Sequence, residues 1–271
     1  MVSTRCCVVG ADRTGNLGGV TSVLAVANQK GGVAKTTTVH SLGAALAERG
    51  RRVLLVDLDP QGCLTYSTGT DPDDLEVSLH DVMVGRLPAA EALIHAADGV
   101  DLLPATIDLA GAEVHLLTRP GREYALSRAL ETLNGGYDTV LIDCPPSLGI
   151  LTINGLTAAQ RVVVPLQCET LSHRGVGQLL ETIADVRSFT NPSLAVLGVI
   201  ATMFDPRTRL ARETLAAVKE KYGLEVLSPA VPKSVRVAEA PGRGCSVLRH
   251  APKSASADAY RSLAAVIEPG P

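Results

Sequence analysis

The chain has 271 residues, of which 46% are hydrophobic and 20% are charged, and its formal net charge is −3. A chain of this size can bury a core large enough to fold without disulfides or structural metals. Aromatic residues make up only 3%, so the core must consist of Val, Leu, Ile and Ala, which favours helices packed on a buried, largely parallel sheet. The six cysteines form no C-x-x-C pair, which argues against a zinc or iron–sulfur motif.

No uncharged run in the sequence resembles a membrane span. The longest, residues 144–160, is interrupted by Pro145 and Pro146. The first residues lack the apolar core and cleavage site of a signal peptide. We therefore expect a cytoplasmic protein with no membrane partner.

The predicted elements begin after a Gly-rich, polar stretch. Residues 1–20 are expected to form a flexible N-terminal extension. The apolar run "VLAVANQ" (23–29) predicts a buried strand that ends in a turn. Residues 36–50 follow with apolar side chains at helical spacing and Gly50 as a stop signal. A strand, a Gly-rich turn and a helix in this order form the context that a phosphate-binding loop requires.

Strands and helices alternate along the rest of the chain. This alternation predicts an α/β fold, a doubly wound and mostly parallel β-sheet with helices on both faces, in a single domain over residues 21–271. Further strands are predicted at 51–62, 98–105, 137–147, 161–167, 195–204 and 225–232, and helices at 122–133, 175–189 and 212–223.

The turn after the first strand, "NQKGGVAKTTTVH" (28–40), departs from the general phosphate-loop pattern at two positions. That pattern is Gly, four residues, Gly, Lys, and Ser or Thr. Gln29 and Ala34 stand where the two glycines before Lys35 belong, and an additional lysine, Lys30, is present. The stretch is therefore either a broken nucleotide site or a different kind of nucleotide site.

Aspartates end two further strands. Asp57 and Asp59 follow one apolar run, and Asp143 ends another. Ligands of open parallel sheets bind beyond the carboxyl ends of the strands, where these side chains would meet the loop. There, Lys35 would neutralise phosphate oxygens, Thr36 would offer its hydroxyl to magnesium, and Asp143 would reach the magnesium shell. Each feature alone has an ordinary structural explanation, but together they favour a nucleotide site.

The charge is distributed unevenly. Residues 1–206 carry 14 Lys and Arg against 22 Asp and Glu, whereas residues 207–261 carry 11 against five. A basic C-terminal quarter indicates an anionic partner. On charge alone, a solvated surface explains it equally well.

Seven segments, in order between about residue 22 and residue 266, resemble the ParA/Soj family of partition ATPases within the wider ParA–MinD group. They are "NQKGGVAKTTT", "RVLLVDLDPQG", "YDTVLIDCPPSLGILTINGLTAA", "VVVPLQCET", "GVIATMFDPRTRL", "VPKSVRVAEAPGRG" and "DAYRSLA". The family loop reads K-G-G-V-G/A-K-T-T, so the resemblance implies a P-loop NTPase with a deviant Walker A motif that uses ATP and Mg²⁺. Alanine at position 34 predicts a backbone there that avoids conformations only Gly tolerates.

The resemblance implies a role for each site residue. Lys30 would reach across a homodimer to the partner subunit's phosphates, like an arginine finger. Asp59 would position the hydrolytic water, Asp57 would lie near the magnesium, and Asp143 would be the Walker B-type aspartate. The phosphates would be held by Lys30, Gly31, Gly32, Val33, Ala34, Lys35, Thr36 and Thr37.

Adenine would contact the late segments around Met203–Phe204 and Pro232–Lys233. The family often has Pro-Arg-Asn where this chain reads "PKS" (232–234), which leaves the base contacts open.

The resemblance also implies partners. The ATP-bound homodimer would bind double-stranded DNA without sequence preference on the nucleoid, and a ParB-like centromere-binding protein would stimulate an otherwise slow hydrolysis. The candidate DNA contacts are Arg236, Lys219, Lys221, Lys233, Arg243 and Lys253.

Two alternatives share the expected fold. A MinD-like positioning ATPase needs a C-terminal amphipathic helix that enters the bilayer, but "YRSLAAVIEPGP" is short, weakly basic and ends in Pro-Gly-Pro. An iron-protein-type reductase needs two cysteines per subunit at the dimer axis, and Cys144 and Cys168 form no evident cluster motif. We therefore expect a chromosome or plasmid partition ATPase.

Overall fold

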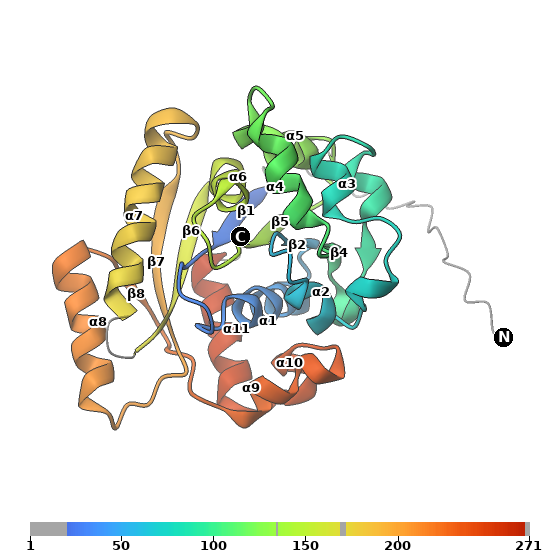
Figure 1. The fold of residues 1–271 in the computed structure, drawn as a ribbon. Helices are drawn as coiled ribbons and strands as arrows, with labels where there is room; N and C mark the ends of the chain where they lie inside the picture. The colour runs from blue at the N-terminus through green and yellow to red at the C-terminus, as the bar shows by residue number, and fades with distance from the viewer. Residues whose placement is uncertain (1–20, 134, 169–171, 269–271) are drawn as a thin grey trace.

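One sheet of eight strands organises the chain (Figure 1). The structure is a computed structural model that describes residues 21–133, 135–168 and 172–268, so the predicted extension at residues 1–20 lies outside the described residues. The strand order is β3-β4-β2-β5-β1-β6-β7-β8, and every pairing is parallel except β3 with β4. The strands are β1 (Ser22–Val26), β2 (Val53–Asp57), β3 (Ile94–His95), β4 (Asp101–Leu103), β5 (Thr139–Asp143), β6 (Arg161–Gln167), β7 (Ala195–Thr202) and β8 (Val226–Leu227).

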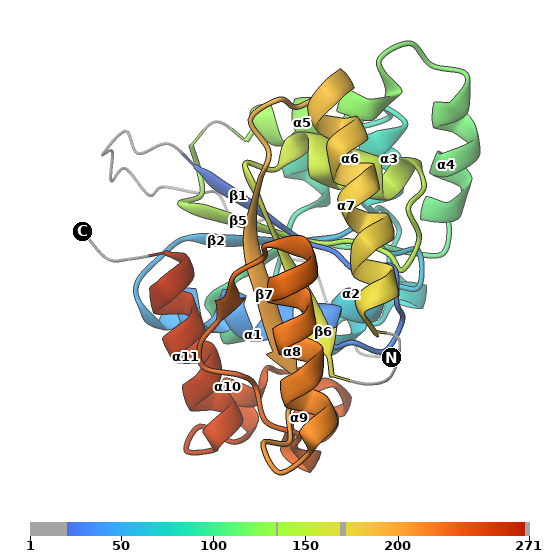
Figure 2. The same cartoon turned by 90° about the vertical axis from the view of Figure 1, so that its left-hand side faces the viewer.

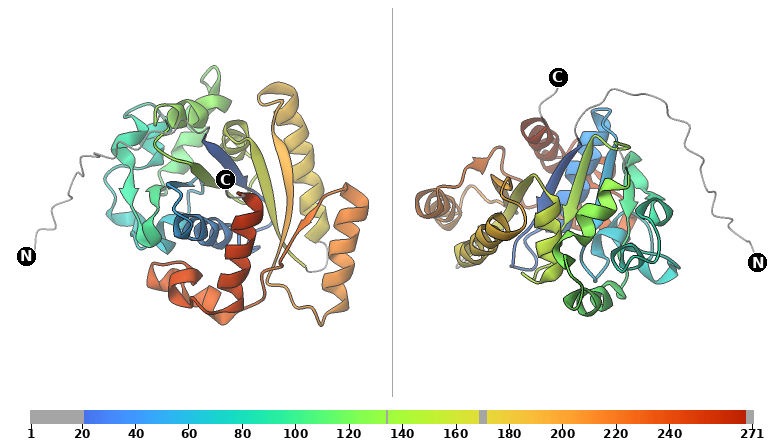
Figure 3. Two further views of the ribbon diagram at one scale, coloured as in Figure 1. Left: turned by 180° about the vertical axis from the view of Figure 1, so that it is seen from behind. Right: turned by 90° about the horizontal axis from the view of Figure 1, so that it is seen from above.

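Helices cover both faces of the sheet, as the views from behind and from above show (Figure 3). Helices α7 and α8 lie at one edge beside β7 (Figure 2). The α-helices are α1 (Lys35–Glu48), α2 (Cys63–Ser67), α3 (Leu79–Met83), α4 (Leu109–Leu117), α5 (Ala125–Glu131), α6 (Ile150–Ala158), α7 (Ser172–Phe189), α8 (Arg209–Tyr222), α9 (Val235–Glu239), α10 (Val247–His250) and α11 (Ala255–Ile267). Short 3₁₀ turns include η1 (Pro72–Asp74), η3 (Ala97–Gly99), η4 (Arg122–Tyr124) and η5 (Pro241–Arg243).

The alternation of side chains along the strands explains the two layers. In β1, Val23 and Ala25 pack into a core with α3 to α7, whereas Leu24 and Val26 pack into a second core with α1, α10 and α11. Successive residues of a strand point to opposite faces, so a strand between two helical layers must be apolar throughout. This is why the predicted strands appeared as continuous apolar runs rather than as alternating patterns.

The predicted doubly wound sheet is confirmed, and each of the seven predicted strands is present, β6 with the predicted bounds and the other six in shorter form. Strand β3 was not predicted, because two residues carry no periodicity that could be recognised. Residues 122–133 divide into η4 and α5. Within the described ranges, no helix combines the length and apolarity that a bilayer crossing needs.

Candidate active site

The loop between β1 and α1 is tied to the centre of the sheet by side chains. The Asn28 amide donates to the carbonyl of Pro165 in β6 at 2.7 Å, and its oxygen accepts the backbone N–H of Lys30 at 3.0 Å. At the other end of the loop, the Thr202 hydroxyl of β7 donates to the carbonyl of Val33 at 3.0 Å. These contacts hold the loop at the carboxyl ends of the central strands.

Ala34 adopts the left-handed backbone conformation, with φ 64° and ψ 36°. The prediction that alanine here reflects a backbone free of that conformation is therefore wrong, because the turn into α1 requires a positive φ whichever residue occupies it. Holding a non-glycine residue there costs on the order of 1 kcal/mol. No described side chain caps the helix at this point, so the first amides of α1 remain available to an anion.

Lys35 directs its ammonium group back over the loop. Its side chain is buried, and Nζ lies 3.3 Å from the carbonyl oxygen of Lys30. Burial lowers the pKa of the Lys35 ammonium group, while Asp143, Cys144 and Asp59 oppose the shift. The lysine is therefore a pre-positioned cation that would gain stability from a phosphate.

Asp57 and Asp143 are direct register partners on β2 and β5, and both are fully buried. One oxygen of Asp57 accepts the backbone N–H and the hydroxyl of Thr65, both at 2.8 Å, and the other accepts the N–H of Asp59 at 3.2 Å. Burial raises the pKa of Asp57 to about 6, although these hydrogen bonds act in the opposite direction. Three hydrogen-bond donors thus hold the Asp57 carboxylate in one orientation.

Asp143 is different, because neither of its carboxylate oxygens has a hydrogen-bond partner among the described residues. Burial and the neighbouring Asp57 raise the pKa of Asp143 well above its ordinary value, while Thr36 and Lys35 act to lower it. Two buried oxygens beside a threonine hydroxyl are hard ligands of the kind that Mg²⁺ prefers. Asp143 and Thr36 therefore fit a magnesium ion.

Asp59 lies in the turn that leaves β2. Its side chain accepts the N–H of Gln61 at 3.1 Å, and its carbonyl accepts the N–H of Gly62 at 2.9 Å. The side chain is partly exposed and faces the loop closely enough to affect the pKa of Lys35. An exposed carboxylate on a turn can move with a ligand, whereas Asp57 on the strand cannot.

A cavity of about 700 Å³ begins at Thr36 and Thr37. It extends from α1 between the Asp59 turn with α2 on one side and α9, η5 and the start of α10 on the other. Its size is that of a small-molecule site. The predicted adenine contacts Met203, Pro232 and Lys233 do not line it.

Those late segments nevertheless come together. Phe204 and Pro232 form a parallel bridge, the N–H of Phe204 donates to Val231 at 2.9 Å, and the N–H of Lys233 donates to Phe204 at 3.4 Å. Met203 has a φ of 47°, which marks a sharp change of chain direction at the end of β7. The structure thus builds one wall from the two predicted segments.

The predicted DNA-contacting side chains are all exposed, but they do not share one region. Arg236 lies on α9 and Arg243 on η5, at the lower edge of Figure 1. Lys219 and Lys221 lie in the last turn of α8, which runs upward away from that edge (Figures 1 and 2). Lys233 and Lys253 lie in exposed loops flanking the α9–α10 region.

The sequence analysis missed residues at the basic surface and behind the phosphate loop. Arg207, which precedes α8, and Arg209 and Arg212 in its first turn are exposed at the end of the helix nearest the lower edge of Figure 1, and only their surplus of positive charge pointed to them. It also missed His40 and Asp98, whose side chains meet at 3.1 Å behind the phosphate loop. No motif marks that pair, because 58 residues separate its members.

The cysteine chemistry of a reductase finds no support in the residues that the structure describes. Cys144 is fully buried, and burial raises the pKa of its thiol far above the ordinary value. None of the described His, Cys, Asp and Glu side chains gather in a group of three or more that could hold a metal.

A helix N-terminus, a buried lysine and two strand-end aspartates at one sheet edge define a P-loop nucleotide-binding protein. Comparison with known proteins agrees: a family model described as an AAA domain matches residues 21–196. The chain is 44% identical over 243 residues to the sporulation initiation inhibitor protein Soj of Bacillus subtilis, covering 89% of this chain and 96% of Soj. It is 46% identical over 245 residues to the chromosome partitioning protein ParA of Caulobacter vibrioides, covering 89% and 92%.

One solved structure carries a different name. A protein from Mycobacterium smegmatis called cobyrinic acid a,c-diamide synthase, with bound ATP analog and magnesium, is 58% identical and superposes with a TM-score of 0.83 over 92% of this chain and 94% of that one. By sequence and fold, the chain belongs to the ParA/Soj family of P-loop ATPases.

Proposed function

We propose that this protein is an ATP-dependent DNA-partition ATPase that uses ATP and Mg²⁺. The observation that carries the proposal is Asp143 at the carboxyl end of the sheet, whose two buried oxygens have no hydrogen-bond partner among the described residues and whose pKa the nearby Lys35 acts to lower. A structure that buries an unsatisfied carboxylate in this way is suited to a ligand that carries its own cation. Relatives solved with ATP analog or ADP and magnesium support the same ligands.

In the proposed reaction, the amides at the start of α1 and Lys35 hold the phosphates, and Thr36 with Asp143 holds the magnesium ion. Magnesium, when bound, supplies charge neutralisation to the triphosphate. Asp59 orients the attacking water from its turn, while Asp57 keeps that turn in place through the N–H of Asp59. The adenine base is proposed to lie against the wall formed by Met203–Phe204 and Pro232–Lys233, which does not line the cavity beyond Thr37.

We infer that ATP closes a homodimer in which Lys30 of each subunit reaches the phosphates of the other. The contact of the Lys30 N–H with Asn28 sets the direction of the loop at this point. Lys30→Ala should therefore bind ATP yet stay monomeric with it. Gel filtration with ATP and with ADP measures this, and a variant that dimerises with ATP as the unmodified protein does would exclude the trans role of Lys30.

The ATP-bound dimer is proposed to bind nucleoid DNA in the cytoplasm through the basic side chains at one end of the molecule, around Arg207, Arg236 and Arg243. Such contacts neutralise phosphates without reading sequence, so binding should weaken steeply as salt rises. A ParB-like partner would stimulate hydrolysis and so release the dimer from DNA.

The decisive experiment compares binding to unrelated DNA duplexes with ATP and with ADP, as salt is varied. Asp59→Ala should bind ATP and accumulate on DNA, because hydrolysis falls by about 10²-fold or more when a transition-state contact is removed. Lys219→Ala is the control, because Lys219 lies in the last turn of α8, away from the lower edge of Figure 1. It should bind DNA almost normally. Equal DNA binding with both nucleotides would refute the proposal.

A second candidate function is ATP-dependent amide synthesis, which the name of the Mycobacterium smegmatis relative suggests. It predicts that cobyrinic acid and an amide-nitrogen donor accelerate ADP release and are converted to the diamide, which mass spectrometry would detect. A MinD-like membrane role is less favoured, since the apolar face of α11 is buried and Tyr260 contacts Thr38 of α1 at 3.3 Å. Sedimentation with liposomes distinguishes that role.

A further inference from the structure

His40 lies on α1 one turn after Thr36 and is almost completely buried. Its Nε2 is 3.1 Å from Oδ2 of Asp98, and its Nδ1 is 3.4 Å from Oγ of Ser67. The same Oδ2 of Asp98 accepts the backbone N–H of Ser246 at 2.8 Å. We call these four residues, His40, Ser67, Asp98 and Ser246, the His40 bridge.

The hydrogen-bond partners indicate how the His40 ring is oriented. Asp98 is a carboxylate and can only accept, so Nε2 donates to it. The Ser67 hydroxyl donates to the carbonyl of Leu64 at 2.9 Å, and its contact with Nδ1 at 3.4 Å is longer. The bond from Nε2 to Asp98 is therefore the contact that holds the ring.

Asp98 is built for this role. Its φ of 66° is a left-handed conformation that a non-glycine residue holds only when its surroundings compensate. Burial raises the pKa of Asp98, but the hydrogen bonds from His40 and Ser246 outweigh it and leave this pKa below its ordinary value. A charged carboxylate in a turn with unfavourable backbone geometry thus faces a buried ring.

The His40 bridge joins four segments of the chain that form or adjoin the proposed nucleotide and DNA sites. His40 extends the helix whose first residues hold the phosphates, and Ser67 ends α2, which follows the Asp59 turn directly. Ser246 precedes α10 and follows α9 and η5, which carry Arg236 and Arg243. Asp98 in η3 is the acceptor that connects the first helix to the last of these segments.

We propose, on the basis of the partition function proposed above, that His40 is a positioning residue whose hydrogen bond to Asp98 couples the nucleotide site to the basic segment of α9, η5 and α10. A shift of α1 or α2 when ATP binds changes the position of the ring. Through Asp98, the ring changes the position of Ser246 and of the segment attached to it. His40 touches neither nucleotide nor DNA in this scheme.

Several titratable groups surround the ring. Asp98 faces it from η3, and α2 contributes only the Ser67 hydroxyl to direct contact. Next to Ser246, Cys245 keeps its proton because burial and Asp98 raise the pKa of its thiol, although Arg249 and Arg243 act to lower it. The other titratable side chains that line the adjoining cavity are Cys63, Tyr66, Asp71 and Asp73.

The first test measures the ring directly in the unmodified full-length protein. Nitrogen-15 NMR of labelled histidine, with His40→Gln used for assignment, reports whether Nε2 carries the hydrogen that is donated to Asp98. We expect a protonated Nε2, and we expect its signal to shift in Asp98→Asn, which retains an acceptor but loses the charge. An Nε2 without hydrogen in the unmodified protein would overturn the proposal.

The second test separates coupling from folding with two isosteric variants. The glutamine amide nitrogen of His40→Gln matches the position of Nε2 and retains the bond to Asp98, whereas that of His40→Asn matches Nδ1 and loses it. Both should bind ATP within about twofold of the unmodified protein. ATP-dependent DNA binding should fall about tenfold in His40→Asn, the effect of one charge-assisted bond, and recover in His40→Gln.

Amide hydrogen exchange of residues 240–250, with ATP and with ADP, gives a readout that needs no DNA. Exchange there should respond to ATP in the unmodified protein and in His40→Gln, but not in His40→Asn. Equal responses in all three would refute the coupling while leaving the partition function intact. If the unmodified protein shows the ATP response but binds no DNA, the partition function fails and the coupling stands.

Discussion

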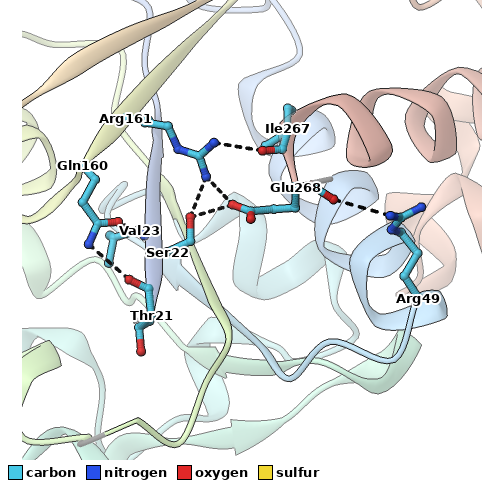
Figure 4. A network of polar contacts seen from close by, with 8 residues as sticks. All are labelled: Thr21, Ser22, Val23, Arg49, Gln160, Arg161, Ile267 and Glu268. Atoms are coloured by element: carbon cyan, nitrogen blue, oxygen red, sulfur yellow. Dashed lines mark hydrogen bonds and ion pairs between the residues drawn. The ribbon is translucent and has the colours of Figure 1, made fainter. Parts of the chain in front are cut away.

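Charged side chains are compensated differently at the two ends of the sheet. At the amino end, Arg161 donates to the Ser22 hydroxyl at 2.6 Å, to the Ile267 carbonyl at 2.9 Å and to the carboxylate of Glu268 (Figure 4). Arg49 also reaches the Glu268 carbonyl. At the carboxyl end, Asp143 buries two oxygens without a partner among the described residues.

This difference separates stability from function. The amino-end network ties the last helix, α11, to β1 and β6, and its charges are satisfied within the chain. At the carboxyl end, Asp57, Asp143 and Lys35 are buried with less compensation than they need, which a bound triphosphate and cation would supply. Substitutions at the two ends should therefore affect different measurements.

The largest expected effect is that of Lys35→Ala. It removes the buried ammonium that faces the phosphates, so ATP affinity should fall by about 10²-fold or more, since hydrogen bonds to charged groups contribute strongly. Isothermal titration calorimetry measures the loss. Urea unfolding measures the accompanying change in stability, since the substitution removes a buried cation but also leaves the buried Asp143 without it. Near-normal ATP affinity would contradict the role of Lys35.

The pH dependence of stability should identify Asp57. Its folded pKa of about 6 lies above the ordinary value of 3.8, so the folded state binds the proton more tightly and stability falls as pH rises between those values. The whole effect amounts to about 2–3 kcal/mol. Asp57→Asn should therefore gain stability relative to the unmodified protein as pH rises through this window, as urea unfolding at a series of pH values would show. A constant difference would exclude this titration.

Arg161→Ala tests the amino end. It leaves the part-buried Glu268 without its ion pair and should cost about 2 kcal/mol of unfolding free energy. ATP affinity should stay unchanged, because the network lies at the opposite end of the strands. The double variant Arg161→Ala with Glu268→Gln should recover part of the lost unfolding free energy. A change in ATP affinity would contradict the separation between the two ends of the sheet.

The smallest effect is expected at Ala34. Ala34→Gly relieves the left-handed backbone at the start of α1 but adds unfolded-chain entropy, so the net gain should be at most about 1 kcal/mol. Thermal unfolding of the nucleotide-free protein measures it. A clear loss of stability would mean that the alanine side chain packs better than its backbone angle suggests.

Most of the sheet and the core of the site could be predicted from the sequence, because both are local patterns. Seven strands follow apolar runs, Asp57 and Asp143 stand directly at the ends of two of them, and Lys35 stands where the loop after the first strand enters α1. The wall formed by Met203–Phe204 and Pro232–Lys233 and the arrangement of the basic surface were less predictable. Phe204 meets Pro232, and Arg236 lies apart from Lys219, only because of how distant segments pack.

By itself, the sequence determined the doubly wound sheet, the phosphate loop and the aspartates beside it, since strand ends and loop positions follow from residues adjacent in the chain. Only the tertiary structure decided that Ala34 takes a left-handed conformation, that the carboxylate of Asp143 is buried without a hydrogen-bond partner among the described residues, and that His40 meets Asp98 and, through it, Ser246. The physical reason is separation along the chain. Contacts between residues 58 and 148 positions apart are set by the packing of whole elements, which no local pattern encodes.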